Sequence, residues 1–197
     1  MNFLNFVILT LLQLYTSVLL LRVWMQCVRA DFYNPFSQFI VKITQPIVRP
    51  LRSVIPSIGP IDTASVLLAY FLLNLTIYLF PEHFIPDSLS KVIQNIHLST
   101  ILPYAFIELL MAMGKILFWL IIARALLSWV NQGRNPIDYL LYQLTEPLMA
   151  PIRRVVPVMG GLDFSAMLVI LIFYALNSLS IDIIYWLLTS VMPQFTS

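Results

Sequence analysis

Apolar residues follow one another in four long stretches of the chain, at residues 3–25, 61–80, 104–130 and 164–192. Each stretch is about as long as the roughly 20 residues that a helix needs to cross the hydrocarbon of a bilayer. Hydrophobic residues make up 60% of the chain and charged residues 10%, and the mean hydropathy is +0.89. So few charges cannot cover a soluble protein of this size, and we therefore predict an all-α membrane protein with four transmembrane helices.

The polar residues between the first and second stretches reappear between the third and fourth. Asn34-Pro35 aligns with Asn135-Pro136 at an offset of 101 residues (135 − 34). Without a gap, the same offset pairs Thr44 with Thr145, Pro46 with Pro147, Pro50 with Pro151, Arg52 with Arg153, Pro56 with Pro157, Gly59 with Gly160 and Asp62 with Asp163. Matches at one fixed spacing indicate a duplication.

The duplication divides the chain into two units joined by an outer connection. Repeat 1 covers residues 1–80, with spans at 3–25 and 61–80 and a loop at 26–60; repeat 2 covers residues 104–192, with spans at 104–130 and 164–192 and a loop at 131–163; the connection is 81–103. Because each unit has two spans, both copies keep the same orientation. The sequence thus predicts two parallel tandem repeats, related by a pseudo-twofold axis along the membrane normal.

Lysine and arginine gather at the two repeated loops. Nine of the eleven basic residues lie at or within these loops, whereas the outer connection carries Lys91 and the terminal tails carry none. Basic residues favour the cytoplasmic side of a membrane, so we expect a multi-pass protein with cytoplasmic loops and with both termini outside. The net charge of +2 gives no general basic field for nucleic-acid binding.

Each loop is expected to begin with a short amphipathic helix. Asn34 and Asn135 can cap it, and the proline that follows each of them suits the first helical position. Phe36, Phe39, Ile40 and Ile43 share one face in repeat 1. Such a segment is too short to span, so it lies either in the membrane interface with its apolar side toward lipid, or under the helix bundle as a plug.

The second half of each loop contains closely spaced prolines. We expect Pro46 and Pro147 to end the short helices, which leaves a bent, non-helical ribbon up to Arg52 or Arg154. Glycine then allows a turn, at Gly59 or Gly160. Asp62 and Asp163 precede the next apolar stretches, where the side chain of an aspartate is well placed to cap a helix.

Four arginines beside the expected amphipathic helices are candidates for a binding platform: Arg49, Arg52, Arg153 and Arg154. Anionic lipid of the cytoplasmic leaflet adds about 1 kcal/mol for each basic residue near the surface. Their simplest role is that of solvated topology signals, and a rigid platform for anionic lipid or another membrane protein is the hypothesis set against it. Arg22 and Arg124, at the inner ends of two spans, could extend to lipid phosphate.

Apart from the charges near the loop ends of the apolar stretches, three charged residues fall inside them: Glu108, Lys115 and Asp182. An ionisable residue in the hydrocarbon is costly and so raises a functional hypothesis, here an outward-facing polar vestibule. The alternative is structural, with Lys115 and Glu108 pairing through water or extending to the interface. Repeat 1 has no charge at the corresponding places, which speaks against a symmetrical charged pore.

The sequence lacks the residues that several kinds of functional site require. Cys27 is the single cysteine, so the chain can form neither an internal disulfide nor a cysteine-based metal site. The sequence contains no nucleophile motif, no phosphate-binding glycine loop and no paired carboxylates of a hydrolase. We therefore expect no enzyme, no metal and no cofactor.

The repeated signature resembles the YggT family of bacterial membrane proteins. It runs from Asn-Pro through Thr-(Gln/Glu)-Pro and Pro-(Leu/Ile)-Arg to Pro, Gly and Asp, and it occurs in both copies, with Gln45 in the first and Glu146 in the second. The resemblance implies a protein of the cytoplasmic (inner) membrane. It also implies a link to tolerance of osmotic shock, with relatives linked to division-site organisation or to the assembly of a membrane cytochrome.

Two function hypotheses follow from the sequence and the resemblance. The first is a non-catalytic scaffold or assembly factor whose partners are anionic membrane lipid and either another membrane protein or further copies of the chain. The second is a small ion or osmolyte channel or transporter. Ion flux in proteoliposomes that depends on Lys115 or Glu108 would favour the second.

Overall fold

A computed structural model describes residues 2–84, 98–131, 135–155 and 164–191. Over these ranges the fold is all-helical, apart from an isolated bridge between Ile58 and Ile61. The helices are α1 (Phe3–Cys27), α2 (Pro35–Arg52), α3 (Thr63–Leu79), α4 (Pro81–Phe84), α6 (Leu98–Asn131), α7 (Pro136–Val155) and α8 (Phe164–Val191).

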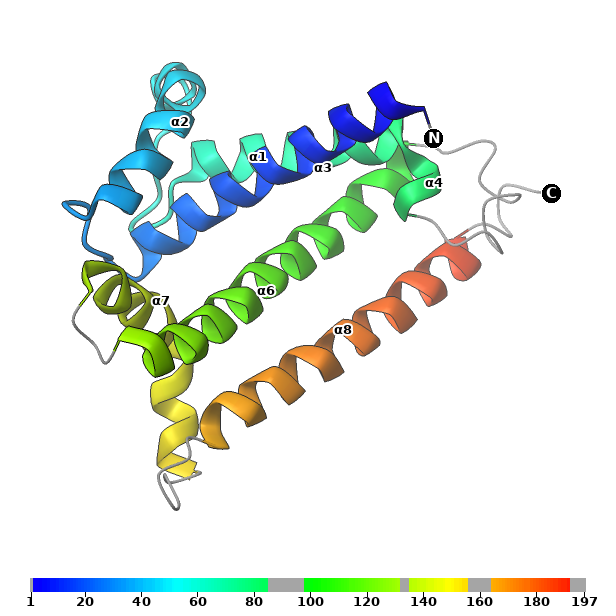
Figure 1. Cartoon of the computed structure of the whole chain (residues 1–197). Helices are drawn as coiled ribbons and strands as arrows, with labels where there is room; N and C mark the ends of the chain where they lie inside the picture. Colours follow the sequence, from blue (N-terminus) through cyan, green and yellow to red (C-terminus); the bar gives the residue numbers. More distant parts are fainter. Residues whose placement is uncertain (1, 85–97, 132–134, 156–163, 192–197) are drawn as a thin grey trace.

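The long helices α1, α3, α6 and α8 run side by side, and α2 and α7 lie together at one end of this bundle (Figure 1). The start of α1 and the end of α8 lie at the opposite end, beside α4. α1 packs mainly on α3, while α6 packs on both α3 and α8. α3 contacts α6, but α8 has no comparable contact with α1 among the described residues. The repeats therefore meet in a one-sided way that differs from the expected pseudo-twofold arrangement.

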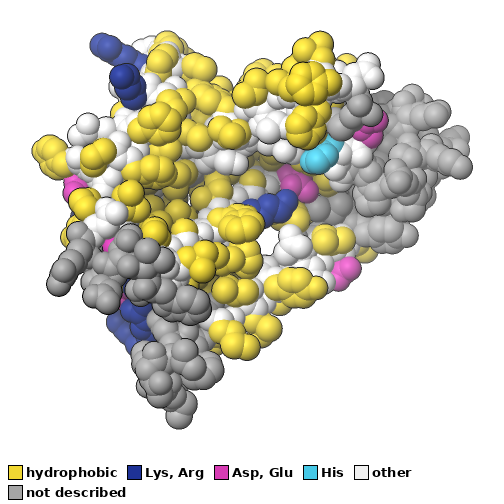
Figure 2. Space-filling view, viewed as in Figure 1, with side chains coloured by type: hydrophobic (Ala, Val, Ile, Leu, Met, Phe, Trp, Pro, Cys, Tyr) yellow, Lys and Arg dark blue, Asp and Glu magenta, His cyan; other side chains and the backbone are white. Residues whose placement is uncertain are grey.

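Among the residues that the structure describes, two helices are long and apolar enough to cross a membrane, namely α1 and the segment Ile101–Leu127 of α6. Only 22% of the most apolar window in each is buried inside the protein. A core helix of a soluble protein would be mostly buried, whereas apolar helices with uncovered surfaces need lipid around them. Figure 2 shows hydrophobic side chains over most of one face of the bundle. These features identify a membrane protein.

The third apolar helix begins earlier than its sequence suggests. α6 starts at Leu98 rather than at residue 104, and it continues through Pro103. Pro103 is the sixth residue of α6, so it lies beyond the four N–H groups that have no partner inside the helix, and it removes one backbone hydrogen bond without ending the helix. The surface helix expected around residues 89–96 lies outside the described residues.

The prediction that Pro46 and Pro147 end their helices is wrong. α2 continues to Arg52 with Pro46 and Pro50 inside it, and α7 continues to Val155 with Pro147 and Pro151 inside it. Both helices change direction along their length (Figure 1), as expected when a proline removes a backbone hydrogen bond without ending the helix. We call α2 and α7 the elbow helices.

Candidate functional site

The side chain of an arginine of α1 hydrogen-bonds to α2, the elbow helix of repeat 1. Arg22 donates hydrogen bonds through Nη1 to Oγ1 of Thr44 and through Nη2 to Oε1 of Gln45 (3.1 Å). Its Nε lies 3.7 Å from Oδ2 of Asp62. The Arg22 side chain is only 2% exposed. A guanidinium removed from solvent in this way needs a nearby negative charge and hydrogen-bond acceptors, and these three residues provide them.

Asp62 joins the C-terminal end of the elbow helix to the start of α3. Its carboxylate accepts from Nε of Arg52 (3.1 Å) and from Nη2 of the same guanidinium, a bidentate pairing, and from Oγ of Ser65 (2.6 Å). Asp62 occupies the N-cap position of α3, yet it makes no capping hydrogen bond, so the expected capping role is wrong. The arginines compete successfully for its oxygens because they carry a positive charge.

The environment of Asp62, which precedes α3, also affects its acidity. Burial alone would raise the pKa of this carboxyl. Hydrogen bonds from Arg52 and Ser65, together with the charges of Arg52 and Arg22, outweigh burial and hold the pKa below its ordinary value. Asp62 therefore stays ionised near neutral pH, as the two arginines require.

Repeat 2 builds a similar contact with another acid. Arg124 of α6 donates through Nη1 to Oγ1 of Thr145 (2.7 Å) and to Oε2 of Glu146 (3.3 Å). Arg153 donates through Nη1 to Oε1 of Glu146 (3.1 Å). The guanidinium carbon of Arg124 also lies 4.8 Å from the ring centroid of Tyr142, within cation–π distance. Glu146 thus bridges two arginines, as Asp62 does in repeat 1.

We call these two clusters the arginine clamps. Clamp 1 consists of Arg22, Thr44, Gln45, Arg52 and Asp62, and clamp 2 consists of Arg124, Thr145, Glu146 and Arg153. The residue after the threonine accepts through an amide in clamp 1 and through a carboxylate in clamp 2. Asp163, the counterpart of Asp62, lies outside the described residues, as do Pro157 and Gly160.

The threonine of each clamp also bonds to its own helix. Thr44 donates from Oγ1 to the carbonyl of Ile40 (2.7 Å), and Thr145 donates to the carbonyl of Leu141 (2.7 Å). A threonine hydroxyl bonded to its own helix in this way favours bending, and a proline follows each of them two residues later. The clamp therefore attaches the arginine at the point where the elbow helix changes direction.

The clamps were only partly predictable as sites. Arg22 and Arg124 were expected to extend to lipid phosphate, and this is wrong, because both side chains turn toward the elbow helix. They are 102 residues apart rather than 101, so a gap-free alignment of the loops does not pair them (124 − 22). Both lie at the inner ends of their spans, and a comparison that allows one missing residue before Asn135 pairs them.

The four platform arginines fall into two classes. Arg52 and Arg153 are held in ion pairs with Asp62 and Glu146, so their main contacts are internal. Arg49 and Arg154 are exposed. Figure 2 shows basic side chains over the parts of the molecule formed by α2 and α7, and a further basic group near the middle of the face.

Other predicted features of the loops are confirmed. Asn34 accepts through Oδ1 from the backbone N–H of Phe36 (2.9 Å), and Asn135 accepts from that of Ile137 (3.1 Å), so both asparagines cap their elbow helices. Gly59 lies in the turn after α2 with a φ of 59°, a conformation that favours glycine.

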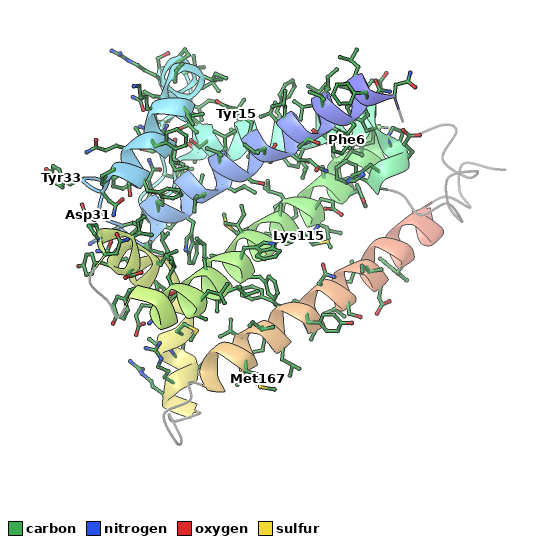
Figure 3. The ribbon with its side chains drawn as sticks, viewed as in Figure 1. Phe6, Tyr15, Asp31, Tyr33, Lys115 and Met167 are labelled. Atoms are coloured by element: carbon green, nitrogen blue, oxygen red, sulfur yellow. The ribbon has the colours of Figure 1, made fainter. Side chains whose placement is uncertain are left out.

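Hydrogen bonds also join the two repeats at the elbows. Trp24 donates from Nε1 to the carbonyl of Leu144 (2.9 Å), and Nδ2 of Asn34 donates to the carbonyl of Pro136 (3.0 Å). The backbone N–H of Asp31 donates to Oε1 of Gln143 (2.9 Å). Asp31 and Tyr33 lie in the turn between α1 and α2, next to α7 (Figure 3). The start of α7 is thus bound to repeat 1.

No ion pair joins the three intramembrane charges to one another within the described residues. Oε1 of Glu108 accepts from the hydroxyl of Tyr104 (3.3 Å). Lys115 lines a groove of about 540 Å³ between α6 and α8, together with Gly114, Phe173 and Asn177 (Figure 3). Asp182 is exposed on α8 and is not among the residues that line this groove. Over the part of the chain that the structure covers, no group of three or more His, Cys, Asp or Glu could hold a metal ion.

Comparisons with known proteins agree with the repeat. The model of the CCB3/YggT family matches residues 1–81 and 103–188. The "Uncharacterized protein YggT" of Escherichia coli K12 is 49% identical over 181 residues, covering 90% of this chain and 88% of its own length. The "Uncharacterized protein in proC 3'region" of Vibrio alginolyticus is 48% identical over 187 residues, covering 93% and 96%. A protein of Haemophilus influenzae is 37% identical over 176 residues, covering 89% and 90%.

No solved structure matches the chain. The family model covers both repeats, and its break falls at residues 82–102, within the connection between them. The matches to whole relatives extend over nearly the full chain on both sides. The chain belongs to the CCB3/YggT family.

Proposed function

We propose that this protein is a non-catalytic scaffold of the bacterial inner membrane, which holds two elbow helices at fixed positions for the assembly or organisation of membrane components. The observation that carries the proposal is the pair of arginine clamps. Each clamp ties an elbow helix to the long helix before it through a buried or half-buried guanidinium. Such pairing favours one fixed geometry of the helix over a set of alternatives.

The proposed topology has four spans, formed by α1, α3, α6 and α8, with both repeat loops in the cytoplasm. The support is that both elbow helices lie at one end of the bundle (Figure 1), where nine of the eleven basic residues occur in the sequence. The positive-inside rule then assigns that end to the cytoplasm and the ends of α1 and α8 to the outside. We also propose, from the family resemblance, that the scaffold serves tolerance of osmotic stress, division or complex assembly.

Anionic lipid is the partner that the elbow surface suits best. Lys42, Arg49 and Arg154 are exposed on the elbow helices and take no part in the clamps. Apolar side chains of α2, including Phe36 and Ile47, are exposed beside them. Basic and apolar groups on one helix at a membrane surface attract acidic headgroups, and each cation contributes about 1 kcal/mol.

The lipid proposal can be tested with the Lys42→Gln, Arg49→Gln, Arg154→Gln triple variant in proteoliposomes. We expect the preference for spin-labelled phosphatidylglycerol over phosphatidylcholine to fall roughly tenfold, because three charges of about 1 kcal/mol each are lost and salt screens part of the effect. Lys115→Gln is the control, because it removes a basic group outside the elbows. An unchanged lipid preference in the triple variant would contradict the lipid proposal.

The scaffold proposal itself is tested by flux. Proteoliposomes that contain the wild-type protein should release neither ions nor small osmolytes faster than empty liposomes, including after an osmotic downshift. Flux that the protein catalyses, and that changes when Lys115 or Glu108 is neutralised, would contradict the scaffold and favour a channel.

The channel remains the second candidate function because of one observation, the position of Lys115 in the groove between α6 and α8. A lysine in a mostly apolar groove could contact a passing anion. The groove is open to one side of the molecule in Figure 2, where a basic group is visible near the middle of the face. Glu108 accepts from Tyr104 and forms no ion pair with Lys115 in the part of the chain that the structure describes. The geometry therefore supports the channel less well than the scaffold.

A further inference from the structure

The groove between α6 and α8 holds a charge at the middle of a membrane span (Figure 3). Lys115 follows Gly114, which is the middle residue of the apolar segment Ile101–Leu127. Its side chain is exposed, and within the described residues it makes no hydrogen bond or ion pair. The hydrocarbon of a bilayer is about 30 Å thick, so an ammonium at its centre has about 15 Å of lipid on either side. Such a charge is costly unless a partner neutralises it.

The groove follows the two helices lengthwise and is otherwise mostly apolar. On α6 it runs from Ile107 to Phe118 and on α8 from Phe173 to Ile183, which is about 15 Å along each helix at 1.5 Å per residue. Its volume is about 540 Å³, and among the described residues that line it Lys115 is the only one with a charge. This length corresponds to about three turns of a helix. The groove therefore has the length and the lining that suit one further membrane helix.

The surface of α8 that faces the groove has no neighbouring helix to cover it. α8 stands at the edge of the bundle (Figure 1), and among the described residues it packs mainly on α6 and α7. Tyr174 and Leu176, which line the groove, are 74% and 52% exposed. In repeat 1, by contrast, α6 contacts both members of the pair α1 and α3. Among the described helices, the pair α6 and α8 thus lacks the third helix that the pair α1 and α3 has.

We propose that this groove binds a transmembrane helix of another protein, and that this helix carries an aspartate or glutamate near the middle of the bilayer. The positive charge of Lys115 selects an acid, because acidic and basic residues inside a membrane pair with one another. The depth of Lys115 selects a helix. A lipid would have to sink its phosphate about 15 Å below the surface of the hydrocarbon, whereas a helix carries its acidic residue at that depth.

A second copy of this chain does not supply an acid at the depth of Lys115. Phe173 lies level with Gly114, since a Cβ atom at Gly114 would be 3.7 Å from the Phe173 ring. Asp182 is nine residues beyond Phe173 on α8, which is about 13 Å nearer the end of the bundle where α8 ends. Glu108 is seven residues before Lys115 on α6, about 10 Å nearer the same end. Because all copies share one orientation in a membrane, neither acid of a neighbouring copy lies level with Lys115.

The inference rests on the proposed scaffold function and names the kind of partner that the scaffold holds. That partner is a membrane protein with an acidic residue inside one of its spans. The elbow helices would contact lipid at the surface, while the groove would contact the partner within the bilayer.

A model transmembrane peptide tests the site. The probe is a synthetic helix of about 20 leucine and alanine residues with lysines at both ends and one glutamate at its centre. The peptide carries an acceptor dye, the full-length protein carries a donor dye at its N-terminus, and energy transfer in phosphatidylcholine liposomes gives the affinity. We expect the glutamate peptide to bind roughly tenfold more tightly than the same peptide with glutamine, because only the carboxylate neutralises Lys115. A peptide with its glutamate moved two turns toward either end should lose this preference.

Two variants of Lys115 separate its charge from its bulk. Lys115→Met keeps a long side chain without the charge and should bind the glutamate and glutamine peptides alike. Lys115→Glu should prefer a peptide with a central lysine, an exchange that a purely structural role of Lys115 would not produce. Because the side chain is exposed, the thermal unfolding of both variants should match that of the wild type.

Cross-linking locates the bound peptide. The protein carries Cys27→Ser and Tyr174→Cys, the peptide carries a cysteine one turn from its glutamate, and a short bis-maleimide should join them. Ile172→Cys in place of Tyr174→Cys is the matched control. Ile172 is also exposed and only two residues away, but it does not line the groove and points to nearly the opposite side of α8.

Three results would overturn the proposal. They are equal binding of the glutamate and glutamine peptides to the wild type, a preference that persists in Lys115→Met, and equal cross-linking at the two positions of α8. If the peptide shows no preference while a spin-labelled fatty acid contacts the protein only when Lys115 is present, the groove belongs to lipid. Flux in proteoliposomes would contradict the scaffold and leave the peptide result standing, whereas loss of the preference without flux would remove this partner and leave the scaffold.

Discussion

Among the described residues, the two clamps use different acids to hold arginines against an elbow helix. Clamp 1 uses Asp62, which comes from the residue before α3, whereas clamp 2 uses Glu146, which lies in the elbow helix itself. Gln45 in clamp 1 occupies the place of Glu146 and still accepts from the arginine of the long helix. The feature common to both repeats is therefore the contact from the arginine of the long helix to the threonine of the elbow helix, whereas the residue after the threonine is an amide in one repeat and an acid in the other.

The repeats also differ in how deeply the clamps are buried. Arg22 and Asp62 are both 2% exposed, whereas Arg124 and Glu146 are 21% and 26% exposed. Water screens an exposed ion pair and leaves it with little net energy, while removal of one partner from a buried pair leaves an uncompensated charge. Clamp 1 should therefore matter far more for stability than clamp 2, and this contrast can be measured.

The largest expected effect comes from the acids. Asp62→Asn leaves Arg22 buried without its charge partner and should lower the free energy of unfolding by about 3–5 kcal/mol. Glu146→Gln, which gives repeat 2 the residue of repeat 1, should cost about 1 kcal/mol or less because the pair is partly exposed. Thermal unfolding in detergent, followed by tryptophan fluorescence, gives both values. Equal losses of unfolding free energy in the two variants would show that burial does not determine how much each clamp contributes to stability.

The pH dependence gives a second readout for Asp62. Its pKa is lower in the folded protein than in the unfolded chain, so its stabilisation is complete above the unfolded value of about 3.9. The stabilisation is then lost as the pH falls through the folded pKa. Wild type should lose stability over this acidic range, and Asp62→Asn should lack that part of the loss.

Much of the fold followed from the sequence, because hydrophobic runs and caps are local signals. The four apolar helices, the caps Asn34 and Asn135 and the turn at Gly59 needed only neighbouring residues. The sequence did not predict that α2 continues through Pro46. A proline weakens a helix, and contacts with the rest of the protein decide whether the helix ends there.

The hydrogen-bond partners of the arginines could not be predicted from neighbouring residues either. Arg22 and Thr44 are 22 residues apart in sequence, and Arg52 and Asp62 are 10 apart, so their contacts depend on how the elbow folds back. Asp62 shows the difficulty best. Its place before an apolar stretch suggests a cap, and only the approach of two arginines in space directs its carboxylate away from the helix.

A smaller effect should distinguish the two capping asparagines. Asn34→Asp keeps the capping oxygen but loses the Nδ2 donor to Pro136, and places a carboxylate against that carbonyl. It should cost about 1–3 kcal/mol, because a buried hydrogen bond is lost. Asn135→Asp keeps its cap in an exposed position and should change stability by less than about 0.5 kcal/mol. The same unfolding measurement applies, and equal effects would mean that the bond between repeats contributes nothing.

The smallest expected effect comes from Gln45→Glu, which gives clamp 1 the acid of clamp 2. Clamp 1 holds two arginines and one aspartate, so the new carboxylate adds a missing negative charge 3.1 Å from Arg22. In the wild type it should stabilise by about 1 kcal/mol at most, because Asp62 already neutralises Arg22 and the new carboxylate must itself be partly desolvated. In the Asp62→Asn background it should restore more than that, because there it supplies the only acid. A double-mutant cycle over these two positions measures the coupling. Equal effects of Gln45→Glu in both backgrounds would show that the acids of the two repeats cannot replace one another, and that the clamps are alike in shape alone.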